Sequence, residues 1–266
     1  MPNSELFSIE NLYKEFWTGN RLYSAGKRVA VNNVSFLIEE NMSIGLVGES
    51  GSGKTTIAKC LDILERPTSG DIKFKGLSIF NLGRSGEKAY RTQVQMVLQD
   101  PYASLDPQRT VEELIREPLI IHKKANPEMI QQEVKEIMRL VGLPSNLQMR
   151  YPHELSGGQR QRVAIARALV IGPRVLIADE PVSALDVSTQ AQILNLLKKL
   201  KKDLNFTLIF ISHDLAVVKY VCDYIVVLKD GSVVEQGTCR DIFQNPASEY
   251  FTHLIEAVPK ASPYDV

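Results

Sequence analysis

Residues 44–56 read IGLVGESGSGKTT, an apolar run followed by a loop rich in glycine and serine. From Gly48 to Thr55 the loop follows the pattern G-x-x-x-x-G-K-[ST], and a segment of helical character comes next. A strand, a glycine-rich loop and a helix start in this order bind phosphate, because backbone N–H groups and the helix dipole converge on its oxygens. The sequence therefore predicts that Lys54 reaches the terminal phosphates of a nucleotide and that the Thr55 hydroxyl binds Mg²⁺.

The expected nucleotide-binding residues cover the whole loop and the residue after it. They are Gly48, Glu49, Ser50, Gly51, Ser52, Gly53, Lys54, Thr55 and Thr56. The alternative is an ordinary Gly-Ser turn that stops a strand, and the order of strand, loop and helix disfavours it.

The composition argues against several classes of protein. The 266 residues include 31 basic and 31 acidic side chains, so the formal net charge is zero, which disfavours a nucleic-acid-binding groove. The apolar runs are much shorter than the roughly 20 residues that span a bilayer. Cys60, Cys222 and Cys239 are far apart and lack metal-ligand spacing. We therefore expect a chain without a secretion signal that stays in the cytosol with reduced cysteines.

Strand-like runs and helical segments alternate in both halves of the chain. We predict a single helix, after Gly53, within residues 6–98. The predicted strands are residues 34–39, 43–47, 71–74, 95–98, 175–178, 207–211 and 224–228. The later strands are fully apolar and lie between helices, which is typical of a parallel sheet covered on both faces.

Between Asp100 and Leu155 strand-like runs are absent, and apolar residues recur every three or four positions. Asn126 followed by Pro127 predicts a helix start, and Gly142 predicts the end of the same helix. We interpret this part of the chain as a helical insertion.

The apolar run at residues 175–178 ends in two carboxylates, Asp179 and Glu180. Asp179 at a sheet edge would hold Mg²⁺, usually through water. Glu180 would accept a proton from the water that attacks the γ-phosphate, or orient that water. Such a pair is more commonly a helix start or a solvated turn, and the loop at Gly48 is what favours the catalytic interpretation.

A third motif, Ser156-Gly157-Gly158-Gln159, precedes a segment with helical periodicity. Ser156 is expected to cap that helix, and the two glycines expose backbone N–H groups to an anion. The motif therefore predicts a second phosphate-binding helix start, although alone it would more commonly be a flexible loop or a cap.

Together, these motifs resemble the nucleotide-binding subunit of an ABC transporter over roughly residues 6–237. The resemblance implies that Gln99 touches Mg²⁺ and the water, that His213 contacts the γ-phosphate, and that Asp186 belongs to a loop crossing the dimer interface. Without the other motifs, Gln99 would be a residue before a turn, and Asp186 and His213 would be helix caps.

The same resemblance implies an α/β fold: a P-loop NTPase core with a mainly parallel sheet covered by helices, an antiparallel β subdomain and an inserted helical subdomain. Residues 1–240 would form one nucleotide-binding domain, with residues 241–266 as a short C-terminal tail. Within it, residues 1–98 and 163–240 would form the catalytic core and β subdomain, and residues 99–162 the helical signature subdomain.

An aromatic side chain near the amino terminus stacks on adenine in this family. Phe16 matches best, and Trp17 and Tyr23 lie in the same segment. Packing within a short β segment is an equally good interpretation of Phe16.

The resemblance also implies how two phosphate sites on one chain work together. ATP would be held between the loop at Gly48 of one subunit and the helix start at Ser156 of a second, so that two subunits meet head to tail. Hydrolysis would open the pair, and the movement would pass through Gln99 and the insertion to a membrane partner. The transport path would come from two separate permease subunits, as in an importer.

Residues 99–107, 151–156 and 241–246 are similar to the oligopeptide, dipeptide and nickel uptake branch. That branch implies a homologous, non-identical second ATPase subunit, an extracytoplasmic solute-binding protein that acts indirectly, and no nucleic acid. The chain would be an ATP- and Mg²⁺-dependent motor at the cytoplasmic face of the inner membrane. Peptide, nickel or metal chelate, and oligosaccharide stay open as the solute.

Two alternatives are a soluble ABC-type ATPase of DNA repair or translation and a nucleotide sensor that is not coupled to transport. The zero net charge and the lack of a coiled-coil insertion, a zinc insertion or a second cassette disfavour the first. Glu180 disfavours the second, because a sensor needs no catalytic base.

Overall fold

The computed structural model describes residues 5–18, 26–122 and 126–257. It has two compact units: residues 1–87 with 209–266, and residues 88–208. Both units combine strands with helices, as the α/β prediction requires.

The first unit contains a four-stranded sheet with the strand order β2-β1-β4-β5, in which the neighbouring strands are antiparallel. Its strands are β1 (Glu5–Thr18), β2 (Gly26–Glu39), β4 (Ser69–Phe74) and β5 (Leu77–Ser78). In the second half of β2, Val34, Phe36 and Ile38 are buried and alternate with more exposed residues, so one face packs on the core. This sheet confirms the predicted antiparallel β component.

A second group of strands in the first unit carries the glycine-rich loop. It comprises β3 (Ser43–Val47), β9 (Tyr224–Lys229) and β10 (Ser232–Thr238). β3 is buried along its whole length and runs parallel to β9, whereas β10 pairs with β9 antiparallel. A Cβ atom at Gly45 would lie 2.8 Å from Val218, so helix α8 (Leu215–Val221) packs closely on β3. The parallel pair covered by a helix agrees with the predicted core.

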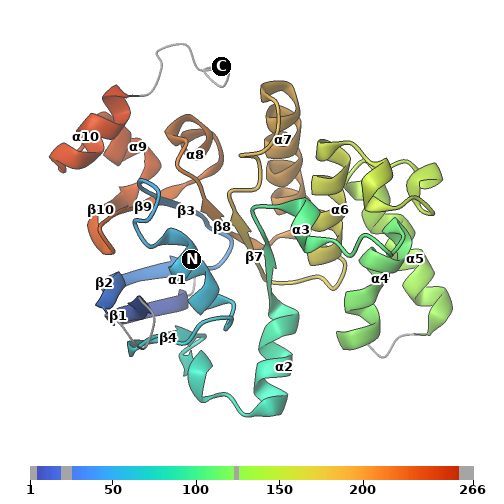
Figure 1. The fold of residues 1–266 in the computed structure, drawn as a ribbon, viewed down its shortest axis with the longest axis horizontal. Helices are drawn as coiled ribbons and strands as arrows, with labels where there is room; N and C mark the ends of the chain where they lie inside the picture. Colours follow the sequence, from blue (N-terminus) through green and yellow to red (C-terminus); the bar gives the residue numbers. More distant parts are fainter. Residues whose placement is uncertain (1–4, 19–25, 123–125, 258–266) are drawn as a thin grey trace. The chain divides into compact units, whose positions relative to one another are not determined.

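The remaining helices of the first unit flank these strands (Figure 1). They are α1 (Lys54–Leu61), the short 3-10 helix at Ile79–Asn81, α9 (Cys239–Gln244) and α10 (Glu249–Glu256). Two elements cross from one unit to the other along the chain, namely α2 (Arg84–Gln93) and β8 (Thr207–Ile211).

The second unit combines one parallel strand pair with a group of helices. β6 (Val94–Val97) runs parallel to β7 (Val175–Asp179). The helices are α3 (Pro101–Ser104), α4 (Val111–His122), α5 (Pro127–Leu140), α6 (Gly157–Leu169), α7 (Val187–Leu204) and the 3-10 helices at Ser145–Leu147 and Pro152–Glu154. Helix α5 has the predicted cap, since the Asn126 side chain accepts a hydrogen bond from the backbone N–H of Glu128. Gly142 follows with φ of 69°.

The prediction of a single helix within residues 6–98 was wrong, because α2 is also present. Its sequence, RSGEKAYRTQ, contains only one buried residue, Tyr90, so the apolar periodicity that reveals a helix is missing. β10 and α9 were likewise not predicted. β10 alternates half-buried with exposed residues and has no strongly apolar run.

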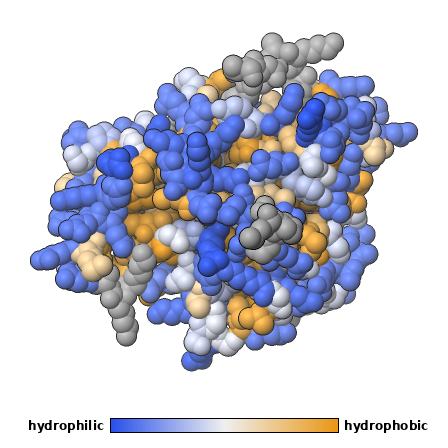
Figure 2. Space-filling view, turned by 180° about the vertical axis from the view of Figure 1, so that it is seen from behind, coloured by the Kyte–Doolittle hydropathy of each residue, from blue (hydrophilic) through white to orange (hydrophobic). Residues whose placement is uncertain are grey.

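The surface is mainly polar on the face seen in Figure 2, with smaller hydrophobic areas between hydrophilic side chains. Exposed apolar residues include Leu77, Ile120 and Ile121. None of the helices in the described part of the chain is long and apolar enough to span a membrane. All three cysteines are buried and free, as predicted.

Candidate nucleotide-binding and catalytic site

The loop after β3 has a backbone that requires glycine at two positions. Gly48 and Gly53 have φ of 146° and 102°. A Cβ atom at Gly48 would lie 2.1 Å from the carbonyl oxygen of Leu228, and one at Gly53 would lie 2.4 Å from that of Ala30. The loop is therefore packed against neighbouring backbone and has no room for side chains at these positions.

Lys54, the first residue of α1, is 5% exposed and folds back over the loop. Its ammonium Nζ donates to the carbonyl oxygens of Gly48 and Glu49, both at 2.7 Å, and to Ser52 Oγ at 3.3 Å. These contacts hold a cation at the start of a helix, where phosphate oxygens are bound favourably. The residues present therefore fit a nucleotide phosphate.

Asp179 and Glu180 lie in the second unit, at the end of β7. Asp179 is 3% exposed, and Glu180 has a left-handed backbone with φ of 46°. Such a conformation is strained for a residue other than glycine and is found preferentially at functional sites. The side chain of Gln99 contacts this residue: Gln99 Nε2 donates to Glu180 Oε2 at 2.8 Å. Two of the predicted catalytic residues are thus in direct contact.

The register of the two parallel strands explains this contact. Val97 of β6 is paired with Ala178 of β7. Gln99 and Glu180 each lie two residues beyond that pair, so both leave the sheet at the same edge. Ligand and catalytic residues gather at this carboxyl edge in parallel α/β sheets.

The helix start at Ser156 is a complete capping box. Ser156 Oγ accepts from the backbone N–H of Gln159 at 3.3 Å, and Gln159 Oε1 accepts from the N–H of Ser156 at 2.9 Å. A Cβ atom at Gly158 would lie 2.5 Å from Thr189 Cγ2, and one at Gly157 would lie 3.2 Å from Leu185 Cδ2. Besides exposing N–H groups, the glycines therefore let this helix start lie close to the first turn of α7.

Asp186 is the cap of α7, which confirms the simpler interpretation of this residue. Its carboxylate accepts from the backbone N–H and the hydroxyl of Thr189 and from the hydroxyl of Ser188. The hydrogen bonds from Ser188 and Thr189 lower the pKa of Asp186, so it is ionised near neutral pH. Its place at a dimer interface stays a prediction.

His213 lies between β8 and α8 and has an exposed side chain. The interpretation of His213 as the cap of α8 is wrong, because the cap is Asp214, whose carboxylate accepts from the N–H groups of Ala216 and Val217. Next to it, Ser212 N donates to the carbonyl oxygen of Leu46 in β3 at 3.4 Å. This contact brings His213 to the end of β3 that leads into the glycine-rich loop.

The aromatic residues near the amino terminus both face lysines. Phe16 is half-buried, with Lys14 Nζ 4.7 Å from its ring centroid. Trp17 is 71% exposed, with Lys27 Nζ 4.9 Å from its ring centroid. Tyr23 lies outside the described residues. Adenine stacking on Phe16 stays a prediction, and Trp17 has the more accessible ring.

One contact to the loop involves a residue that the sequence did not single out. The backbone N–H of Glu49 donates to the hydroxyl oxygen of Tyr250 in α10 at 3.1 Å. The two residues are 201 positions apart, and no motif connects them.

Known proteins with similar sequences are transport ATP-binding proteins. A family model described as ABC transporter matches residues 31–183. The dipeptide transport ATP-binding protein DppF of Haemophilus influenzae is 41% identical over 262 residues, which are 98% of this chain and 80% of that protein. The oligopeptide transport ATP-binding protein OppF of Lactococcus lactis subsp. lactis is 44% identical over 231 residues, 87% of this chain and 72% of that protein.

Solved structures of ATP-binding cassettes share the fold. The dimeric cassette MJ0796 in a post-hydrolysis state, bound to ADP and Pi, superposes with a TM-score of 0.78 at 31% identity. The match covers 88% of this chain and 99% of that one. The chain therefore belongs to the ABC transporter family and is one of its ATP-hydrolysing cassettes.

Proposed function

We propose that this chain is the motor subunit of an importer for peptides. The observation that carries the proposal is the similarity to DppF and OppF, which extends over 98% and 87% of the chain. Both relatives are named for peptide transport, whereas the glycine-rich loop and Glu180 alone would suit any ATPase.

In this proposal the loop from Gly48 to Thr56 binds the phosphates of ATP, with Lys54 at the terminal phosphates. Among the described residues, no group of three or more His, Cys, Asp or Glu side chains could hold a metal ion. As the family resemblance implies, Thr55, Asp179 and Gln99 would hold Mg²⁺ together with phosphate oxygens, because they carry the oxygen ligands that this ion prefers. When bound, Mg²⁺ neutralises charge on the phosphates.

Glu180 is the proposed base, and Gln99 is the residue that holds it. Because Gln99 Nε2 donates a hydrogen bond to Glu180 Oε2, a displacement of Gln99 would break or shift this bond and so change the orientation of the carboxylate. Gln99 lies two residues before α3, at the start of the helical insertion. A partner that moves the insertion would thereby control the orientation of the attacking water. His213 would contact the γ-phosphate from the end of β8.

The proposed partners complete the site and the transport path. The helix start at Ser156–Gln159 and the segment at Asp186 would meet the nucleotide of a second, homologous ATPase subunit. Two permease subunits would form the path through the inner membrane, with this chain bound to their cytoplasmic face. An extracytoplasmic binding protein would deliver the solute to them.

Helix α4 supplies a surface for the permease. It borders a groove of about 470 Å³ that is lined by four charged and two apolar side chains. The groove is lined by Arg109, Glu113, Arg116, Glu117, Ile120 and Ile121. The two isoleucines are each 55% exposed. A short amphipathic helix of a permease would bury them and pair with the surrounding charges.

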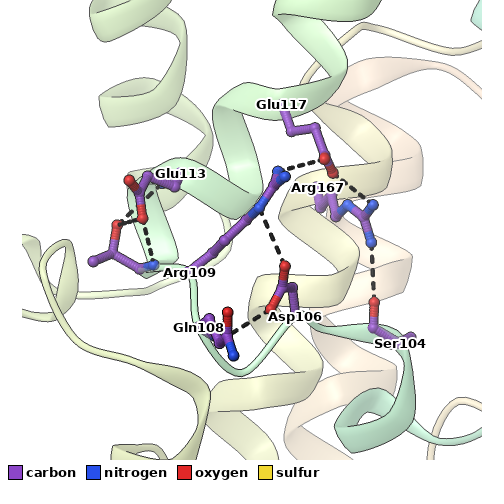
Figure 3. A network of polar contacts seen from close by, with 8 residues as sticks. Ser104, Asp106, Gln108, Arg109, Glu113, Glu117 and Arg167 are labelled. Atoms are coloured by element: carbon purple, nitrogen blue, oxygen red, sulfur yellow. Dashed lines mark hydrogen bonds and ion pairs between the residues drawn. The ribbon is translucent and has the colours of Figure 1, made fainter.

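A network of ion pairs connects this groove to α6, the helix that begins after Ser156 (Figure 3). Glu117 in α4 binds two arginines, Arg109 and Arg167 of α6, the latter at 2.8 Å. Arg167 also donates to the carbonyl oxygen of Ser104 in α3, at 3.1 Å. Arg109 continues the network to Asp106 at 3.3 Å. Movement of a docked helix would therefore reach α3 and α6 together.

The docking surface is tested by placing a charge in it. Ile120→Asp is expected to reduce co-purification of the chain with its permease subunits at least about tenfold, because it replaces an apolar contact with a carboxylate that must lose its water when the permease docks. Leu77→Asp is the matched control, since Leu77 is 67% exposed on β5. Equal loss of co-purification in both variants would contradict the surface at α4.

The solute class is tested on the complete transporter in vesicles. ATP hydrolysis is expected to rise at least severalfold when the binding protein is added with a mixture of short peptides. The matched controls are the same binding protein with nickel chelates and with oligosaccharides. Stimulation by one of these in place of peptides would overturn the proposed solute. Hydrolysis stimulated by nucleic acid in a salt-dependent way would favour a soluble ATPase instead.

A further inference from the structure

The C-terminal helix α10 is attached firmly to the first unit. The Glu235 carboxylate of β10 accepts hydrogen bonds from the N–H groups of Ala247 and Ser248, at 2.8 and 3.0 Å. Ser248 then caps α10. Phe251 is fully buried, and its ring contacts that of Phe243 at 5.4 Å between centroids. The start of α10 therefore has a defined position relative to β10.

This attachment brings Tyr250 to the glycine-rich loop. Its hydroxyl oxygen accepts the backbone N–H of Glu49 at 3.1 Å, and Lys229 Nζ lies 4.9 Å from its ring centroid. Burial raises the pKa of the Tyr250 phenol, so the group is neutral at physiological pH. A neutral hydroxyl near an anionic ligand adds no repulsion.

The N–H of Glu49 and the carbonyl of Gly48 belong to the same planar peptide group. Tyr250 binds this group at the N–H, and Lys54 Nζ binds it at the carbonyl oxygen, at 2.7 Å. The rotatable backbone bonds before this peptide group are those of Gly48, and glycine permits φ and ψ angles that other residues do not. Without a partner for the N–H, this peptide group would have greater freedom to turn, and the carbonyl that holds Lys54 would turn with it.

We propose that Tyr250 is a positioning residue for ATP binding: its hydroxyl holds the Gly48–Glu49 peptide group in the orientation that places Lys54 over the loop. The inference rests on the proposed role of Lys54 at the phosphates. It gives the helix at Glu249–Glu256 a function in nucleotide affinity. Because the contact is made to the backbone, it does not depend on the identity of the Glu49 side chain.

The test is Tyr250→Phe, which keeps the ring above Lys229 and removes only the hydroxyl. In the purified chain, the Kd for ATP is expected to rise about fivefold, the effect of one neutral hydrogen bond. In the assembled transporter, KM should rise by a similar factor while kcat changes less than about twofold. Thr252→Val is the matched control, because it removes a hydroxyl of α10 whose hydrogen bond goes to the carbonyl of Ser248, away from the glycine-rich loop.

A second variant, Glu235→Ala, releases the start of α10 and should raise Kd in the same direction. If Tyr250→Phe failed to fold, the Kd of Glu235→Ala would decide the question. An unchanged Kd and KM in Tyr250→Phe, or a fall in kcat alone, would overturn the inference. Lys54→Ala distinguishes this outcome from a failure of the proposed function. If that variant bound ATP with wild-type affinity, the proposed role of Lys54 at the phosphates would itself be wrong.

Discussion

Glu180→Gln is expected to lower the rate of ATP hydrolysis at least about 100-fold while ATP still binds, the range that general bases contribute. The amide has nearly the shape of the carboxylate, and its oxygen can still accept the hydrogen bond from Gln99. It cannot, however, accept a proton from water. Phosphate release measures the hydrolysis rate, and binding of a fluorescent ATP analogue measures affinity.

The control for this substitution is Glu136→Gln, which removes the charge of an exposed carboxylate paired with Arg139 on α5. That variant should hydrolyse ATP at the wild-type rate. If Glu180→Gln retained more than about a tenth of the activity, another group would have to act as the base. In the expected case, the variant should accumulate a nucleotide-bound dimer, because ATP would bridge two subunits without being cleaved.

Lys54→Ala is expected to raise the Kd for ATP about 100-fold, because hydrogen bonds to charged groups contribute about 1.5–3 kcal/mol each. The ammonium is buried at the loop and held by the carbonyl oxygens of Gly48 and Glu49, so no other lysine of α1 can replace it. A ligand that binds only the folded chain raises its melting temperature. The variant should therefore lose the thermal shift that ATP produces.

Lys59→Ala tests whether any positive charge on α1 contributes to ATP binding, because Lys59 lies in the last turn of the same helix and is exposed. We expect this variant to show the thermal shift of the wild-type chain. A full ATP-dependent shift in Lys54→Ala would contradict the assignment of the ammonium to the phosphates.

Elements whose signals are local were predictable. The glycine-rich loop could be predicted because the strand, the glycines and the lysine are consecutive in the sequence, and its backbone requires glycine at Gly48 and Gly53. Helix α5 could be predicted because Asn126 and Pro127 are helix-start signals that act within one turn. Helix α2 could not be predicted, because a surface helix with one buried residue shows no apolar periodicity in its sequence.

The amino-acid sequence by itself determined the fold class and the chemistry of the motifs, since both depend on residues that are neighbours along the chain. Only the tertiary structure decided which distant groups meet. The contact of Gln99 with Glu180 follows from the register of β6 and β7, and the contact of Tyr250 with Glu49 from the attachment of α10. Strand register and helix docking are set by the packing of whole elements, and no local pattern encodes them.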